Sequence, residues 1–447
     1  MSSNTETNPG LRRAAPGGGR RVPVALVVTV LAGLAAVAGG LRALLPALQV
    51  EQPTAANKAL VQMQDFRDAL YYPVQEFLAG RDPYLPQAML DNWPVRQTFN
   101  LYQPYHLVLH MPFGALPYKT GAVAFTLVLL VLTIVLAVLA AIELRRFVPV
   151  PVLTGAAVIS ALLLSSQLGK AQLYLGQINP EIAVATAGAL MLRKKHPVWA
   201  AVLVGLAWIK PQFGAPLVAF LLVRGSWRVA LGGTGIAAAA SLPVVGVLVS
   251  NAGGVGNFIA DIRANLDWAE QTAYGAVDSP VAERVDVAAV LFRTTGLLPP
   301  MAELVTLVGV MVVAALLVRA LDRTGDDGDS VLADLLIGLS ITIAIVHQPG
   351  DVLVALPAAA GAAGWWWTRR TERPAWPLPL ALVLFAFPFA HLFALDTVLR
   401  GLFGEQFALT VDGIAIIAAW LVLVGYVVVR VRNTGRRGTR QDEVASS

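Results

Sequence analysis

Long apolar stretches recur along the whole chain and constrain its fold more than any other feature. They lie near 23–46, 119–144, 151–168, 176–192, 197–209, 212–223, 229–250, 300–320, 329–347, 351–367, 376–394 and 409–432. A helix needs about 20 apolar residues to cross the hydrocarbon layer, where every backbone group must find its partner inside the protein. Only 14% of the 447 residues are charged, against about a quarter in soluble proteins. The sequence therefore predicts an all-α integral membrane protein, a helical bundle of about 12 transmembrane helices.

The boundaries of this membrane domain follow from composition. The polar, Gly- and Pro-rich segment 1–22 and the segment 433–447 are predicted to be disordered cytoplasmic tails around one polytopic domain at 23–432. The first apolar stretch has no clear small-x-small cleavage site, so it is interpreted as a retained span. The stretches 197–209 and 212–223 are each too short to cross alone. One kinked helix or two tilted helices fit them equally well, and the number of spans stays open.

Arginine and lysine cluster in every second turn between the stretches, which indicates one orientation in the membrane. The clusters lie at 12–21, 145–146, 193–195, 224–228, 319–323, 369–373 and 430–440. Under the positive-inside rule these turns and both termini are cytoplasmic. Two long loops, about 47–118 and 251–299, then lie outside and carry most of the carboxylates. Arg outnumbers Lys, and Ala, Val and Gly abound, so we predict a multi-pass protein of a bacterial plasma membrane.

Several classes of function are disfavoured by what the sequence lacks. It contains no cysteine, so disulfides and thiolate metal sites are excluded. The basic residues fall in short clusters between apolar runs, and we therefore predict no nucleic acid partner. No Walker A, Rossmann glycine or H-E-x-x-H pattern occurs.

The first long loop begins with a segment in which apolar and acidic residues recur with helical spacing. The apolar stripe comprises Phe66, Leu70, Val74 and Phe77. The opposite face carries Asp65, Asp68 and Tyr72. This pattern predicts a helix that lies flat on the membrane, apolar face down, and presents two carboxylates to the protein. Such a carboxylate can act as a general base, and a solvated acidic face explains the pattern equally well.

Three further features point to an anionic ligand at the external face. Gln177-Ile178-Asn179-Pro180 starts a span, and its free backbone N–H groups would attract an anion, although capping alone explains it as well. Lys210 lies between two apolar half-helices, where an ammonium group is costly unless it faces a partner or a polar cavity. A lipid phosphate would be a natural partner, and snorkelling to the interface is the alternative. His347 lies in a tight turn and could donate to a phosphate or a sugar hydroxyl.

Taken together and in order, these motifs resemble glycosyltransferase family 87 over roughly residues 60–370. The motifs are the acidic helix with Tyr71-Tyr72, the turn Gly80-Arg81-Asp82-Pro83-Tyr84, Gly176-Gln177-Ile178-Asn179-Pro180, Gly205-Leu206-Ala207-Trp208-Ile209-Lys210-Pro211, and a His in a late external turn. This family belongs to the GT-C superfamily of membrane enzymes. It includes actinobacterial polyprenyl-phosphate-mannose-dependent α-mannosyltransferases and related arabinofuranosyltransferases.

The resemblance implies a GT-C-like fold in which membrane-parallel helices of the first external loop cover a cavity. It implies a polyprenyl-phosphate-sugar donor, a glycolipid or cell-envelope glycan acceptor, and an inverting reaction with an aspartate base. Asp65 is the first choice for the base and Asp68 the second. The resemblance implies a substrate-binding role for Lys210 and His347, which would hold the phosphate, and for Gln177, Asn179 and Tyr72. No cofactor is expected, and a need for a divalent cation stays open.

Two other classes of function compete with this interpretation. A transporter or lipid-linked-sugar flippase would place its charges at mid-membrane and would show inverted repeats, and neither is clear in the sequence. A non-catalytic membrane scaffold would not need Asp65, Asp68, Lys210 and His347 to converge in space.

Overall fold

The computed structural model describes residues 23–371, 376–390 and 393–446, and within these ranges every regular element is a helix and no strand occurs. The long helices are α1 (Val24–Gln49), α6 (Tyr118–Arg145), α12 (Trp227–Asn251), α15 (Ala302–Asp322) and α20 (Glu405–Ser446). The shorter ones are α7 (Val152–Ser165), α8 (Gln167–Leu175), α9 (Asn179–Leu192), α10 (Pro197–Ala207), α11 (Pro211–Val223), α16 (Asp327–Ala344), η2 (Pro349–Ala355), α17 (Leu356–Thr368), α18 (Pro377–Ala390) and α19 (Phe393–Phe403). Each predicted apolar stretch contains a helix, so the all-α prediction is confirmed.

Fewer helices qualify as complete membrane spans than the sequence suggested. Five of those described are long and apolar enough by length and composition, and a sixth forms if α7 and α8, bent by 69°, count as one. The stretches around Lys210 form two separate helices, α10 and α11, because Pro211 begins a new helix. The predicted tail at 1–22 lies outside the described residues. The segment 433–446, predicted to be disordered, continues α20 as a helix that no proline interrupts.

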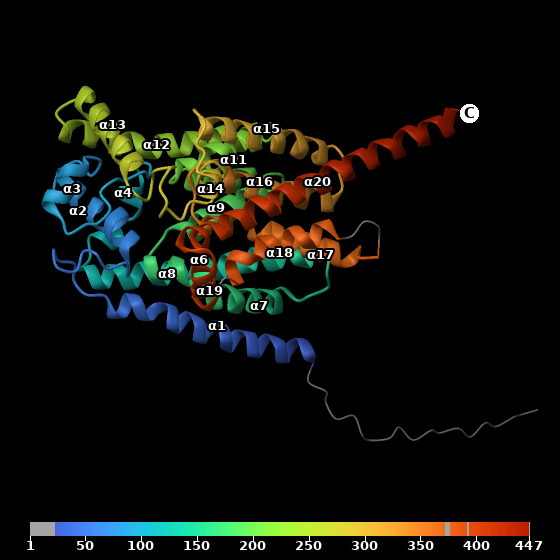
Figure 1. Ribbon diagram of the computed structural model, residues 1–447, viewed down its shortest axis with the longest axis horizontal. Helices are drawn as coiled ribbons and strands as arrows, with labels where there is room; N and C mark the ends of the chain where they lie inside the picture. The colour runs from blue at the N-terminus through green and yellow to red at the C-terminus, as the bar shows by residue number, and fades with distance from the viewer. Residues whose placement is uncertain (1–22, 372–375, 391–392, 447) are drawn as a thin grey trace, which may run out of the picture.

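The two long loops lie together at one end of the bundle, which we call the loop end (Figure 1). The first loop, residues 50–117, contains η1 (Phe66–Tyr71), α2 (Tyr72–Leu78), α3 (Pro86–Asn92), α4 (His106–Leu109) and α5 (Met111–Gly114). The second loop, residues 252–301, contains α13 (Val255–Gln271) and α14 (Val287–Thr295). Asn100 and Asn265 join the loops by reciprocal hydrogen bonds, each 2.8 Å long, between the side chain of Asn265 and the backbone of Asn100.

Helix ends rich in arginine are joined by ion pairs. Arg224, at the end of α11, is buried and makes a bidentate contact with Asp322 of α15 at 2.8 Å. It also pairs with Asp334 of α16, and Arg193, the residue that follows α9, lies 3.6 Å from Asp322. The arginine-rich turns that the sequence placed on one side of the membrane therefore meet in space around shared carboxylates.

Replacing Arg224 with alanine is expected to destabilise the protein by about 3–5 kcal/mol, because Asp322 and Asp334 would lose their buried partner. The apparent unfolding temperature of purified protein in one detergent measures this loss. Arg323→Ala is the matched control, since Arg323 is exposed and lies next to Asp322 in sequence. Equal unfolding temperatures for the two variants would contradict the prediction.

The apolar stripe of the predicted helix in the first loop packs against other parts of the protein. Phe66 and Leu70 are fully buried, and the Phe66 ring stacks on Phe125 of α6 with centroids 5.2 Å apart. The segment is also underwound relative to the expected spacing, because the Tyr72 N–H donates to the carbonyl of Arg67, five residues back. A π-helical turn of this kind shifts the phase of all following side chains. Asp65 and Asp68 therefore do not share one polar face.

Candidate active site

A cavity of about 1000 Å³ lies at the loop end, where several segments distant in sequence meet. Its lining comes from residues 61–69 and 96–102 of the first loop, 175–177, 210–212, 266–284 and 298–307 around the second loop, and 345–351. A cavity of this size that contains convergent polar groups is the expected form of a small-molecule site.

Asp65 reaches this cavity because the first loop approaches the end of α8 very closely. The Met63 N–H donates to the Tyr174 carbonyl at 2.8 Å, and Gly176 has a φ of +69°. A Cβ atom at Gly176 would lie 2.7 Å from the Cβ of Phe66, so only glycine fits both the conformation and the contact. The half-buried Asp65 carboxylate lines the cavity next to this junction.

The surroundings of Asp65 favour its protonated form more than water does. Burial raises the pKa of Asp65 to about 6. A side-chain hydrogen bond with Gln177 and the charge of Lys210 lower this pKa, while the charges of Asp68 and Asp351 raise it. A carboxylate with such a pKa can accept a proton close to neutral pH.

Lys210 occupies the break between α10 and α11 with only 8% of its surface exposed, and it lines the cavity. Its Nζ donates to Asn179 Oδ1 at 2.5 Å and lies 3.6 Å from Asp351 Oδ1. The rings of Tyr102 and Phe213 lie 5.9 and 5.8 Å from the same Nζ. An ammonium group held in this way, at the wall of a polar cavity, is suited to bind an anion.

A chain of side-chain amides holds the lysine in place. Asn179 Nδ2 donates to Gln172 Oε1 at 2.7 Å and to Gln177 Oε1 at 2.9 Å. Gln177 Nε2 donates to Gln348 Oε1 at 2.9 Å, and the Gln348 N–H donates to Asp351 Oδ2 at 2.9 Å. Gln177 lines the cavity, whereas Asn179 is 1% exposed and lies behind it. Both polar atoms of the Asn179 amide are engaged, and its oxygen holds the Lys210 ammonium in place.

His347 lines the same cavity from the segment between α16 and η2. Its Nδ1 lies 2.9 Å from the Ile345 carbonyl, so Nδ1 carries the proton, and its buried Nε2 has no partner. Burial lowers the pKa of His347 below its ordinary value. The imidazole is therefore neutral at rest, with Nε2 available to a ligand.

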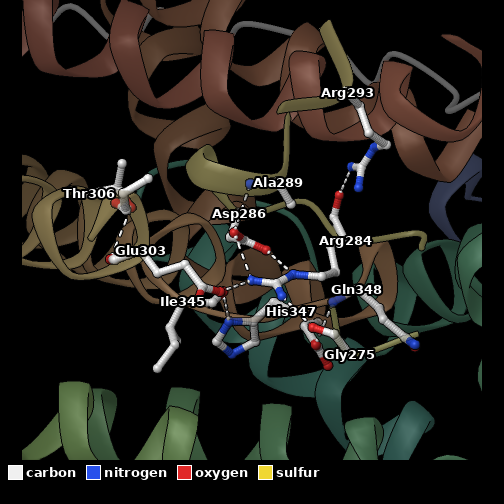
Figure 2. A network of polar contacts seen from close by, with 12 residues as sticks. Gly275, Arg284, Asp286, Ala289, Arg293, Glu303, Thr306, Ile345, His347 and Gln348 are labelled. Atoms are coloured by element: carbon white, nitrogen blue, oxygen red, sulfur yellow. Dashed lines mark hydrogen bonds and ion pairs between the residues drawn. The ribbon is translucent and has the colours of Figure 1, made fainter. Parts of the chain in front are cut away.

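Arg284 ties the second loop to the segment that carries His347. Its Nε lies 2.8 Å from Asp286 Oδ2, its Nη2 2.5 Å from Glu303 Oε1, and its Nη1 2.5 Å from the Gly275 carbonyl. Figure 2 shows these groups converging on the guanidinium, with His347 beside them. The N–H of Val285, the next residue, donates to the His347 carbonyl at 2.9 Å. Arg284 therefore fixes the second loop as a wall of the cavity.

Asp68 and Tyr72 are not brought to the cavity. Asp68 is 2% exposed and accepts two bonds from Arg67, at 2.6 and 3.0 Å. It also accepts the backbone N–H groups of Arg96 at 3.2 Å and Gln97 at 3.0 Å, so it anchors that part of the first loop. Tyr72 is 3% exposed and stacks on Trp93 at 4.9 Å. Asp65 is thus the only one of the two predicted bases that lines the cavity.

Many of the residues that line the cavity were not identified as site residues from the sequence, among them Arg96, Tyr102, Tyr274 and Asp351. Asp351 ends the turn that begins at His347. This position in the sequence is the feature by which it could have been identified. The other three become adjacent to the site only when the two loops pack together. Among the described residues no group of three or more His, Asp or Glu side chains is arranged to hold a metal ion.

Comparison with known proteins gives one match. The sequence model of glycosyltransferase family 87 matches residues 100–349, more than half of the chain. The matched range includes Gln177, Lys210 and His347 and ends just before Asp351. No curated protein and no solved structure matches the chain.

Proposed function

This chain belongs to glycosyltransferase family 87, and we propose that it transfers a sugar from a polyprenyl-phosphate donor to a glycolipid or cell-envelope glycan. Mannose is the proposed sugar, and arabinofuranose is the second candidate. One observation carries the proposal: the carboxylate of Asp65 and the ammonium of Lys210 line the same cavity at the loop end. A base and a phosphate-binding cation are the two groups that transfer from a phosphate-linked sugar requires.

In the proposed reaction Asp65 takes the proton of an acceptor hydroxyl. The hydroxyl oxygen forms a bond to the anomeric carbon, and the bond from that carbon to the phosphate oxygen breaks. The electron pair of the broken bond leaves with the polyprenyl phosphate, and attack opposite to it inverts the configuration. Lys210 stabilises the charge that develops on the departing phosphate, a contribution that grows in the transition state.

His347 has a supporting part in this proposal. Its Nδ1 proton is committed to the Ile345 carbonyl, so Nε2 can donate only when the ring is doubly protonated. A bound phosphate raises the pKa of the ring and favours that form. His347 would then add a second charged donor to the leaving group.

We propose that the loop end faces the outside of a bacterial plasma membrane and that both termini are cytoplasmic. The arginine-rich helix ends joined through Arg224 and Asp322 support this orientation, because such turns stay in the cytoplasm. The donor and the acceptor would then meet at the extracytoplasmic face, where a lipid-linked sugar and an envelope glycan are both accessible.

The proposal is tested with purified protein in nanodiscs, a synthetic polyprenyl-phosphate-mannose donor and a membrane glycolipid extract. Appearance of mannosylated acceptor with release of polyprenyl phosphate supports it. A parallel reaction with EDTA shows whether a divalent cation is needed. If mannosyl, arabinofuranosyl and glucosyl donors are all left intact, transferase activity is refuted. Translocation of the intact donor across a vesicle membrane would then support a flippase.

The rate of transfer is expected to rise with pH through about 6. Burial raises the pKa of Asp65 from 3.8 to about 6, and only the ionised form of an acid accepts a proton. Below that pH the rate constant kcat/KM should fall by about tenfold per pH unit as Asp65 becomes protonated. Initial rates between pH 4.5 and 8 measure this limb. A profile that stays flat down to pH 4.5 would exclude a base of this pKa.

A further inference from the structure

Arg96 and Tyr274 form a bridge between the two loops across the wall of the cavity. Both line it. Arg96 Nη2 donates to the Tyr274 hydroxyl, and the guanidinium lies 5.2 Å from the centre of the Tyr274 ring. Arg96 Nη1 also points to Gln64 Oε1 at 3.4 Å. No carboxylate among the described residues forms an ion pair with Arg96, so N–H groups of its guanidinium are available to a ligand.

Each side of this bridge is held by a buried group. The first loop is anchored at Arg96 by Asp68, whose carboxylate accepts the Arg96 and Gln97 N–H groups. The second loop is anchored next to Tyr274 by Arg284, which donates to the Gly275 carbonyl at 2.5 Å. The backbone at both ends of the bridge is therefore held in place, which limits how much of the two loops must reorder to receive a ligand.

The bridge and the groups assigned to the donor phosphate interact with neighbouring residues of the first loop, Gln64 and Asp65. The carboxylate of Asp65 interacts with Gln177 and Lys210, the groups assigned to the phosphate. The preceding residue, Gln64, reaches instead to Arg96. An acceptor whose hydroxyl contacts Asp65 opposite the donor would extend toward Arg96 and Tyr274.

The chemistry of this region fits a sugar ring. Tyr274 is 42% exposed, and its ring offers an apolar surface for the C–H face of a pyranose. Arg96 and Gln97 supply N–H donors for sugar hydroxyls, while the cavity carboxylates Glu270 and Asp278 accept from them. Carboxylates outnumber the arginine and lysine side chains in the lining of the whole cavity, so a neutral acceptor is favoured over an anionic one.

Building on the proposed transferase function, we propose that Arg96 and Tyr274 form the acceptor subsite and select a neutral glycan. The test uses the protein in nanodiscs, the polyprenyl-phosphate-mannose donor and two matched acceptors. One is a neutral alkyl-linked mannobiose, and the other carries a phosphate on a hydroxyl that does not react. We compare Arg96→Ala, Tyr274→Ala and Tyr274→Phe with Lys58→Ala, a control at an exposed site in the first loop.

We expect Arg96→Ala and Tyr274→Ala to raise KM for the neutral acceptor by about 10–100-fold. This is the loss of affinity expected when one hydrogen bond to a charged group is removed. KM for the donor should stay unchanged, which also shows that the variants are folded. Tyr274→Phe keeps the ring and should have a smaller effect. The wild-type protein should prefer the neutral acceptor.

Three results would overturn the inference: an unchanged KM for the acceptor, an equal rise in KM for the donor, or a preference for the phosphorylated acceptor. Failure of the proposed function is distinguishable, because the wild type would then consume no donor. Saturation-transfer NMR of the neutral mannobiose without donor gives an independent readout. Loss of its signal in Arg96→Ala supports the subsite, whereas an equal signal in wild type and variant refutes it.

Discussion

Replacing Asp65 with asparagine is expected to lower kcat by about 10²–10⁴-fold, the usual contribution of a general base. Asparagine is nearly isosteric with aspartate and keeps the contact with Gln177, but it cannot accept a proton. KM for the donor should change little, because the phosphate is assigned to Lys210 and His347. Single-turnover transfer from polyprenyl-phosphate-mannose measures the chemical step directly.

Two substitutions in the same loop serve as controls for Asp65→Asn. Asp91 is an exposed carboxylate outside the cavity, and Asp91→Asn should retain wild-type kcat. Asp68→Asn should chiefly lower the unfolding temperature, because it leaves the buried Arg67 without its ion pair. If Asp68→Asn abolished transfer in a protein of normal stability while Asp65→Asn stayed active, the roles of the two carboxylates would be reversed.

The helices of this protein could be predicted from the sequence because the membrane leaves few alternatives. An apolar stretch in lipid must satisfy its backbone internally, and each such stretch contains a helix. The number of complete membrane spans was harder to predict than the positions of the helices. A stretch such as 197–223 has the composition of a membrane segment, but Lys210-Pro211 divides it into two short helices whose packing depends on their neighbours.

The candidate site could be predicted only in part. Residues with a local sequence signal were identified, whereas residues that reach the cavity only through tertiary packing were not. Lys210 and His347 were identified because a cation in an apolar stretch and a His in a turn are local signals. Asp68, the second choice for the base, does not line the cavity, because a π-helical turn changes the phase of its segment and Arg67 forms an ion pair with it. Arg96 and Tyr274 could not be found, since only the packing of the two loops brings them together.

Replacing Lys210 with methionine is expected to lower kcat by about 10²–10³-fold, as removal of one preorganised donor to a developing negative charge does elsewhere. Methionine keeps the apolar contact with the rings of Tyr102 and Phe213 but supplies no charge. The loss should also appear as weaker binding of the donor. Lys119→Met is the matched control, since Lys119 is exposed at the start of α6, beside the first loop.

The pH dependence of the transfer rate separates an electrostatic role of Lys210 from a structural one. The charge of Lys210 lowers the pKa of Asp65, so Lys210→Met should move the acidic limb of the pH–rate profile above about 6. A purely structural defect would reduce the amount of active protein and leave the position of the limb unchanged. An unmoved limb in a variant that is fully folded would show that the charge of Lys210 does not act on Asp65 in the working enzyme. The predicted direction follows from sign alone, because removal of a positive charge favours the neutral form of a neighbouring acid.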